Sequence, residues 1–286
     1  MAALSERSED IRHRMPERDE SFRCLYHYAD SRLSEHYLRQ RPESYFRPAP
    51  PRGMRVLRGR AADHESDHER TCQLTAAVAD SRVPALRVWR PHRQVAFGRR
   101  DAREDGYERA RGIARERGYA VLERSVGGRA VAYTGTTVAV ALAVPTDGDR
   151  SGIQRRYDDA SARLQSALDV LGVDASEGEP PDSFCPGSHS LQAGGKIAGI
   201  AQRVRQRVAV VAAVLVVDDR DEIATLLDPV YSALGVPFDP ESVGSIALAG
   251  GPADPDAVIE ALVATFVGDR STAVEHASDE TELRDT

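Results

Sequence analysis

Apolar and polar residues along this chain repeat with two different spacings, and each spacing predicts a different kind of element. Apolar residues recur three or four positions apart in five segments, which predicts helices at about 63–80, 102–117, 153–171, 220–234 and 255–267. Short β-branched and apolar runs predict strands at about 54–57, 85–89, 94–97, 119–123, 129–133, 137–144, 189–203 and 207–217. A polar stretch that contains two adjacent prolines, 173–187, predicts a loop.

The order of these elements indicates the fold class. Several strands follow one another without a helix between them, which favours an α+β domain over a doubly wound parallel sheet. We expect a mixed or antiparallel sheet with helices packed on one face, and a small helical part near the C-terminal end. The runs 137–144 and 207–217 are nearly all Val, Ala and Leu, so we expect them at the buried centre of the sheet.

The two ends of the chain differ from its middle. Residues 1–53 are dense in charged side chains, close on a proline-rich stretch and show no sustained periodicity, which predicts a poorly ordered extension. The folded domain is expected to cover 54–268. The last residues, 269–286, are acidic and predict a disordered tail.

Charge and apolar content narrow the class of protein. The net charge of −7 disfavours sequence-independent nucleic-acid binding, which needs a basic face. No apolar run reaches the roughly 18 residues that span a bilayer, and the N-terminus lacks the apolar core of a signal peptide. We therefore expect a cytoplasmic protein that binds neither nucleic acid nor a membrane. The three cysteines form no Cys-x-x-Cys pair, so no metal site is expected.

One residue stands out in the composition. Of the 38 basic residues, 37 are arginine and one is lysine, Lys196. Arginine does not replace lysine where a compact, rotatable or titratable amine is needed, because guanidinium is bulky, planar and always charged. The pattern therefore suggests a functional amine at Lys196. The alternative is a lysine that was retained by chance on a surface turn, which would give the same composition.

Two glycine-rich stretches carry candidate chemistry. In the first, Gly127 and Gly128 lie between two predicted strands beside Arg124, where backbone N–H groups can approach an anion or a narrow acyl chain. A simple turn would show the same pattern. In the second, Cys185 precedes Pro-Gly on a loop, and Lys196 follows. An ammonium near a thiol lowers the thiol pKa and stabilises an oxyanion; the alternative is that Cys185 is a small buried apolar residue.

Three stretches resemble one family. Residues 124–135 resemble the Arg-Arg-Ser-Gly-Gly-Gly-Ala-Val-x-His-Asp signature of lipoate–protein ligase A and its relatives, and 195–203 resembles that family's lysine motif. Trp89-Arg90 with Gly98-Arg99 resembles an earlier motif, so the resemblance covers about 54–265. It implies an α+β fold shared with biotin–protein ligases and a catalytic domain that holds an acyl chain beside Lys196. The implied acyl- or nucleotide-binding residues are Arg124, Gly127, Gly128, Ala130, Val131, Gly195 and Gly199.

The resemblance leaves three functions open. Cys185-Pro-Gly-Ser-His-Ser-Leu is most similar to the Cys-Pro-Gly-Ser-Tyr-Asp-Leu pattern of lipoyl amidotransferases, which implies a Cys185 thioester assisted by Lys196 and no cofactor. The acyl group, octanoyl or lipoyl, would go to the lysine of a lipoyl-carrier domain, either the 2-oxoacid dehydrogenase E2 component or the glycine-cleavage carrier. A lipoate–protein ligase would instead use ATP and Mg²⁺ through lipoyl-adenylate. A non-catalytic acyl-binding module is the alternative from another class.

The chain departs from the family pattern at four positions. Arg129 stands where the ligases have a third glycine, and Tyr133-Thr134 replaces their His-Asp pair. Ser190 stands where both branches usually carry aspartate. These changes disfavour the use of ATP.

Overall fold

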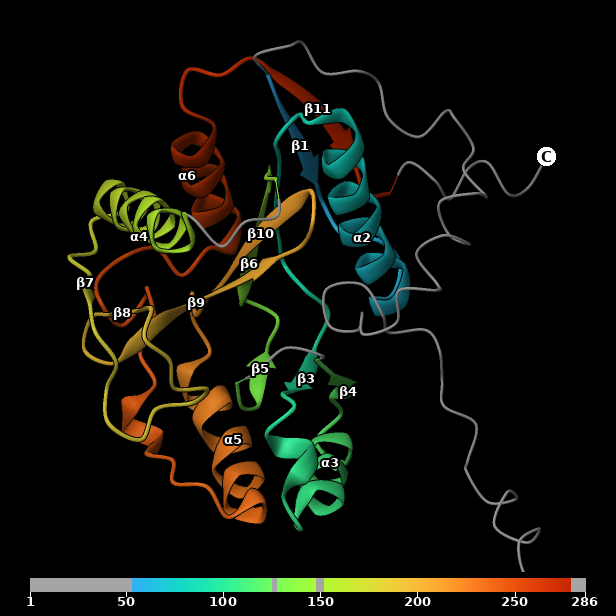
Figure 1. Cartoon of the computed structure of the whole chain (residues 1–286). Coiled ribbons are helices and arrows are strands. Elements are labelled where there is room, and N and C mark those ends of the chain that lie inside the picture. Colours follow the sequence, from blue (N-terminus) through green and yellow to red (C-terminus); the bar gives the residue numbers. More distant parts are fainter. Residues whose placement is uncertain (1–52, 125–127, 148–151, 279–286) are drawn as a thin grey trace, which may run out of the picture.

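The computed structural model describes residues 53–124, 128–147 and 152–278 (Figure 1). Nearly all of the predicted N-terminal extension, and the last residues of the predicted tail, lie outside these ranges. The described strands are β1 (Met54–Arg58), β2 (Ala85–Trp89), β3 (Gln94–Phe97), β4 (Ala120–Glu123), β5 (Val131–Tyr133), β6 (Val138–Pro145), β7 (Ser176–Glu177), β8 (Ser190–Gln192), β9 (Lys196–Val204), β10 (Val208–Leu215) and β11 (Thr272–His276). The helices are α2 (His64–Ser81), α3 (Tyr107–Glu116), α4 (Ile153–Val170), α5 (Arg220–Leu234) and α6 (Pro255–Val267), with 3₁₀ turns η1 (Asp101–Arg103) and η2 (Pro240–Ser242).

The strands form two sheets, and the α+β class with a mixed sheet is confirmed. The large sheet has the order β11-β1-β2-β6-β10-β9-β8-β7, with parallel pairs at the β11 end and antiparallel pairs elsewhere. The small sheet has the order β4-β3-β5. As their Val- and Ala-rich sequences predict, β6 and β10 lie in the interior of the large sheet and pair along eight residues.

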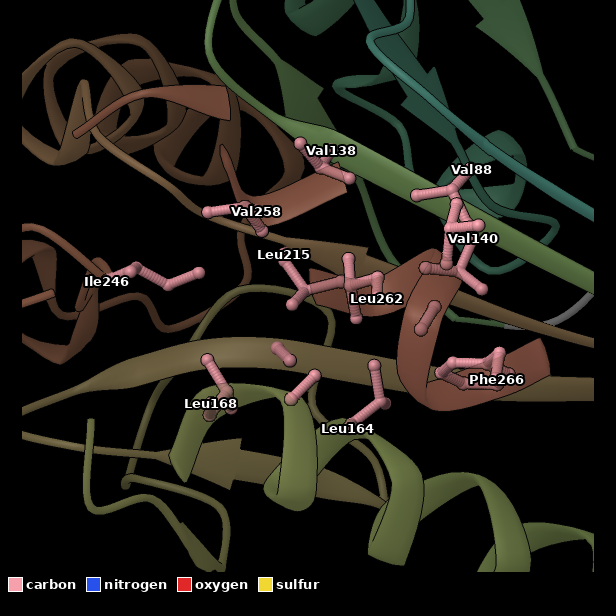
Figure 2. Packing of buried hydrophobic residues seen from close by; sticks show 14 of the residues in the cluster. Val88, Val138, Val140, Leu164, Leu168, Leu215, Ile246, Val258, Leu262 and Phe266 are labelled. Atoms are coloured by element: carbon pink, nitrogen blue, oxygen red, sulfur yellow. The ribbon is translucent and has the colours of Figure 1, made fainter. Parts of the chain in front are cut away.

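Helices α4 and α6 cover one face of the large sheet, where a hydrophobic core lies (Figure 2). Alternate residues of the central strands point to this face, including Val88, Val140 and Leu215. They pack with Leu164 of α4 and Leu262 of α6, both fully buried. Each such side chain contributes roughly 1.5–3 kcal/mol of burial free energy. Helix α6, the helical part that the sequence predicts near the C-terminal end, is therefore part of the main core.

Helix α2 lies on the opposite face, so helices cover both faces of the sheet and not the one face that the sequence predicted. Strands β1 and β2 are parallel neighbours, and a parallel pair needs a crossover connection. Helix α2 is that crossover, and its Leu74 and Val78 are buried with Ala141 and Val210 of the sheet. The side chain of Asp63 caps the helix by accepting a 2.8 Å hydrogen bond from the Ser66 N–H.

Two further elements differ from the sequence-based expectation. The predicted helix 102–117 is split into η1 and α3 by a turn at residues 105–106. A Cβ at Gly106 would lie 1.6 Å from the Ala233 carbonyl oxygen, so this turn packs directly on α5 and needs glycine there. Residues 272–276, expected to be disordered, form β11. They pair with β1 in parallel, and Glu275 forms a 2.9 Å ion pair with Arg55. The edge of β1 accepts a polar strand because pairing uses backbone groups.

The described part of the chain contains no helix that is both apolar and long enough to cross a bilayer.

Candidate active site

Lys196 is the first residue of β9, and its side chain is only 1% exposed. Its ammonium makes four hydrogen bonds, all to oxygen atoms. Nζ lies 2.8 and 3.1 Å from the two carboxylate oxygens of Glu179. It also donates to the backbone carbonyls of Phe184 and Cys185, each at 3.0 Å. A single buried cation thus holds the loop that carries Cys185 onto the start of β9.

Glycines allow the chain to deliver this lysine. Gly195 has a φ of +136°, and a Cβ there would lie 2.7 Å from the Gly244 amide nitrogen. The backbone of 243–244 therefore packs directly on the turn before Lys196, and Gly244 donates a 3.0 Å hydrogen bond to the Lys196 carbonyl. A Cβ at Gly199 would lie 3.5 Å from Lys196 Cε, an ordinary van der Waals distance, so Gly199 lies directly against the lysine side chain.

Glu179 is the counter-charge of Lys196, and sequence patterns do not single it out. Its carboxylate also accepts hydrogen bonds from the hydroxyls of Ser183 and Ser190. Burial by itself raises the pKa of Glu179, but the hydrogen bonds from Lys196 and the two serines outweigh burial and lower the pKa below its ordinary value. Because the folded-state pKa is lowered, the stability that this carboxylate contributes is present at neutral pH and is lost as the pH falls through the lowered value.

Cys185 lies in the loop before β8 and is half-buried. Its φ of +44° is in the left-handed region, which costs a non-glycine residue about 1–3 kcal/mol and clusters at functional sites. The thiol points toward the turn that follows β4. Sγ lies 3.4 Å from the Arg129 amide nitrogen and 3.7 Å from Arg124 Nη2. The cationic side chain in contact with the thiol is thus that of Arg124, whereas Lys196 contacts the Cys185 carbonyl.

Gly128 brings this turn close to the thiol. It has a φ of +98°, and a Cβ at Gly128 would lie 2.9 Å from Cys185 Sγ. A Cβ at Gly98 would lie 2.1 Å from the Gly128 carbonyl oxygen, so the backbone at Gly98 also packs directly against this turn. The bulky Arg129 side chain, at the third-glycine position, extends to Glu104 at 2.6 Å and Asp101 at 3.4 Å. The turn therefore accommodates Arg129 by directing it into an ion pair.

Tyr231 joins the two sides of the site from α5. Its hydroxyl accepts a 2.6 Å hydrogen bond from the Cys185 N–H and donates a 2.9 Å hydrogen bond to the Ala130 carbonyl. The side chain is fully buried, and burial raises the pKa of Tyr231 well above its ordinary value. The group is therefore a neutral hydroxyl at physiological pH, the form that both donates and accepts.

An apolar strip of small residues extends from Lys196 across the sheet. Gly199, Val214 and Ala139 face one another on adjacent strands, and Ala201 and Ala212 form the next row on the same face. Helix α2 packs farther along this face, and Ala201 remains exposed while Gly199, Ala212 and Val214 are half-buried. This strip offers an apolar surface that begins at the buried lysine.

Most of the residues that the sequence singled out lie together. Lys196, Cys185, Arg124, Gly128 and Gly199 meet at this site, and the carbonyl of Ala130 is bound to it through Tyr231. Val131 is buried in the core beneath the small sheet, and Gly195 shapes the turn behind Lys196. Gly127 lies outside the described residues. The described residues contain no group of three or more His, Cys, Asp and Glu side chains placed to hold a metal ion.

Two residues of the site were missed. Glu179 lies in a polar loop, and its only sequence signal is indirect: a carboxylate is missing at position 190, where Ser190 stands. Tyr231 has the spacing of an ordinary apolar residue on α5. A buried tyrosine hydroxyl normally has a partner, but the sequence does not show which one.

Comparisons with known proteins agree with the motifs. Residues 68–267 match the model of the lipoyl protein ligase A/B catalytic domain. An octanoyl-GcvH:protein N-octanoyltransferase from Geobacillus kaustophilus is 33% identical over 138 residues, 48% of this chain and 49% of the relative. A lipoyl-GcvH:protein N-lipoyltransferase from Listeria monocytogenes is 28% identical over 157 residues, 52% of this chain and 55% of the relative. The chain thus matches about half the length of these relatives.

Solved structures show the same fold. A lipoate-protein ligase A bound with ATP superimposes with a TM-score of 0.60 at 21% identity, covering 78% of this chain and 89% of that one. A structure of a bi-partite lipoate protein ligase and its E2 lipoyl domain from Thermoplasma acidophilum gives a TM-score of 0.57 at 19% identity, covering 78% and 87%.

Proposed function

Because this chain belongs to the lipoyl protein ligase A/B catalytic domain family, we propose that it transfers an octanoyl or lipoyl group to a lysine of a lipoyl-carrier protein through a thioester on Cys185. The observation that carries the proposal is the placement of Cys185. This strained loop residue presents its thiol to a glycine turn and to Arg124, while its own backbone carbonyl accepts a hydrogen bond from the buried Lys196. The names of the two curated relatives support both the reaction and the GcvH carrier.

The first step loads the enzyme. The Cys185 sulfur attacks the carbonyl carbon of the acyl amide on a donor carrier; the S–C bond forms, the C–N bond breaks, and the thiol proton ends on the departing lysine amine. The negative charge that develops on the carbonyl oxygen needs donors close to the sulfur. The Arg129 N–H and the Arg124 guanidinium are the donors that contact Sγ, and the Lys196 ammonium adds positive charge from the other side of the loop.

The second step delivers the acyl group. The amine of an acceptor lysine attacks the thioester carbonyl; the new C–N bond forms, the S–C bond breaks, and a proton from the amine returns to the sulfur. Net consumption of ATP is not required, because the overall reaction exchanges one acyl-lysine amide for another and the thioester only carries the acyl group between them. The acyl chain would lie on the strip formed by Gly199, Ala201, Ala212 and Val214, where each buried CH₂ contributes about 0.8 kcal/mol.

The proposal is tested by separating the possible donors. Purified protein is mixed with octanoylated glycine-cleavage carrier and an unmodified E2 lipoyl domain without ATP, and in parallel with octanoate, ATP and Mg²⁺. Transfer in the first mixture, seen by the mass of the acceptor domain, is the expected result. Modification of the acceptor domain in the second mixture alone would establish the ligase reaction instead. If the acceptor domain is modified in neither mixture, the protein is a non-catalytic acyl-binding module.

Replacing Tyr231 with phenylalanine is expected to slow transfer about 10²-fold, because the Cys185 N–H and the Ala130 carbonyl both lose their partner and the thiol loses its fixed position. Initial rates of transfer measure the effect. Tyr119→Phe is the matched control: that hydroxyl donates a 2.6 Å hydrogen bond to Glu222 and contacts no residue of the site. Equal rates for Tyr231→Phe and the wild type would contradict the assignment.

A further inference from the structure

Among the described residues, the ammonium of Lys196 has one negatively charged partner. Its hydrogen-bond acceptors come from the loop between β7 and β8: the Glu179 carboxylate and the carbonyls of Phe184 and Cys185. The carbonyls are neutral acceptors. Within the part of the chain that the structure describes, Glu179 alone compensates the charge, and its side chain is 22% exposed while that of Lys196 is 1% exposed.

A buried ammonium without a counter-charge favours its neutral form, because desolvation penalises the charged state. A neutral amine has only two N–H groups, too few to hold Glu179 and both carbonyls of the Cys185 loop. It also carries no positive charge to offset the negative charge that forms on an acyl carbonyl. Whatever keeps Lys196 protonated therefore also maintains the geometry around Cys185.

Position 190 lies beside the same carboxylate. The Ser190 hydroxyl donates to Glu179 Oε2, the oxygen that lies 3.1 Å from Lys196 Nζ. The Ser183 hydroxyl donates to the other oxygen. A carboxylate placed at position 190 would therefore lie next to the ammonium, within the cluster that Glu179 now occupies.

We propose that Glu179 is a positioning residue that keeps Lys196 charged and directed at the Cys185 loop, a role that a carboxylate at the adjacent position 190 can also fill. The part of this inference that concerns catalysis rests on the proposed function. The part that concerns the charge of Lys196 does not depend on it.

Among the described residues, no other charged side chain hydrogen-bonds the ammonium. The loop between β7 and β8 also carries Asp182 and His189. The Cys185 thiol is on the same loop, with Arg124 against its sulfur and the Tyr231 hydroxyl on its backbone N–H. Strand β8 and residues 243–246, which pack on Lys196, contribute no charged side chain. Arg124 repels the ammonium, so it cannot replace Glu179 as the partner that favours the proton.

The charge of Lys196 can be followed directly, because it is the only lysine in the chain. Protein labelled with lysine that carries ¹⁵N at Nζ should give one side-chain signal, whose position is recorded against pH. In Glu179→Gln the transition is expected at a lower pH than in the wild type, because the counter-charge of the ammonium is gone. Glu177→Gln is the matched control, since Glu177 is exposed on β7 and bonds the Ser161 hydroxyl; its titration should match the wild type.

A second variant tests replacement of the carboxylate. Glu179→Gln combined with Ser190→Asp is expected to move the transition back toward the wild-type pH. The alkaline limb of the transfer rate should follow: it falls at lower pH in Glu179→Gln, because Lys196 loses its proton sooner, and recovers in the double variant. The double variant also keeps the test in place should the single variant fold poorly.

The outcomes separate this inference from the proposed function. Unchanged titration of Lys196 in Glu179→Gln would overturn the inference even in an active enzyme. The expected shift in a protein that transfers no acyl group would support Glu179 as the counter-ion and count against the proposed function alone. A shift that Ser190→Asp fails to reverse would overturn the equivalence of the two carboxylate positions.

Discussion

Transfer of the acyl group should fall about 10²- to 10³-fold when Lys196 is replaced by arginine or methionine. The ammonium is fully enclosed and directs its hydrogen bonds at Glu179 and at two carbonyls of the Cys185 loop. Arginine keeps the charge but not the shape, because its planar guanidinium is larger and Gly199 lies against Cε. Initial rates of acceptor modification measure the loss. Activity of Lys196→Arg within fivefold of the wild type would contradict it.

The same substitution also affects folding, and a double variant separates the two effects. Lys196→Met leaves the Glu179 carboxylate without its cation, which we expect to cost about 1–3 kcal/mol of unfolding free energy. This is less than for a fully buried ion, because 22% of the Glu179 side chain is exposed. Adding Glu179→Gln should restore much of the stability, measured by thermal unfolding, without restoring transfer. Recovered transfer in the double variant would show that Lys196 has only a structural role.

Replacing Cys185 with serine should abolish the covalent intermediate and reduce turnover by at least about 10³-fold. The hydroxyl would occupy the same place against Gly128 and Arg124, but it is a far weaker nucleophile than a thiolate. The mass of the intact enzyme, recorded after mixing with octanoylated carrier and no acceptor, should increase by one octanoyl group in the wild type and remain unchanged in the variant.

Peptide mapping of the loaded enzyme provides the control for this experiment. The octanoyl group is expected on Cys185, and hydroxylamine at neutral pH should release it because a thioester is cleaved under these conditions and an amide is not. If the octanoyl group is found on Lys196, the enzyme carries it as an amide and the thioester route is wrong. Undiminished turnover of Cys185→Ser would remove Cys185 from the reaction altogether.

Most of the secondary structure follows from local pattern. The expected ranges 85–89, 94–97, 220–234 and 255–267 agree with β2, β3, α5 and α6. These segments have a clear apolar period and a definite end signal, such as Gly235 in the left-handed region after α5. The failures are segments whose state depends on a distant partner. The helical pattern is interrupted at Gly106, which packs directly against α5, and residues 272–276 form β11 because β1 offers an edge.

The candidate site shows the same division between local and distant information. One amine, one thiol and a glycine turn can be picked out from the residues alone, because a lone lysine among arginines and the spacing of the motifs are visible without a fold. Their partners follow from the three-dimensional packing. Glu179 reaches Lys196 across a loop, and Tyr231 reaches Cys185 from a helix 46 positions away. Such contacts depend on how loops and helices pack against the sheets, and local periodicity does not contain that information.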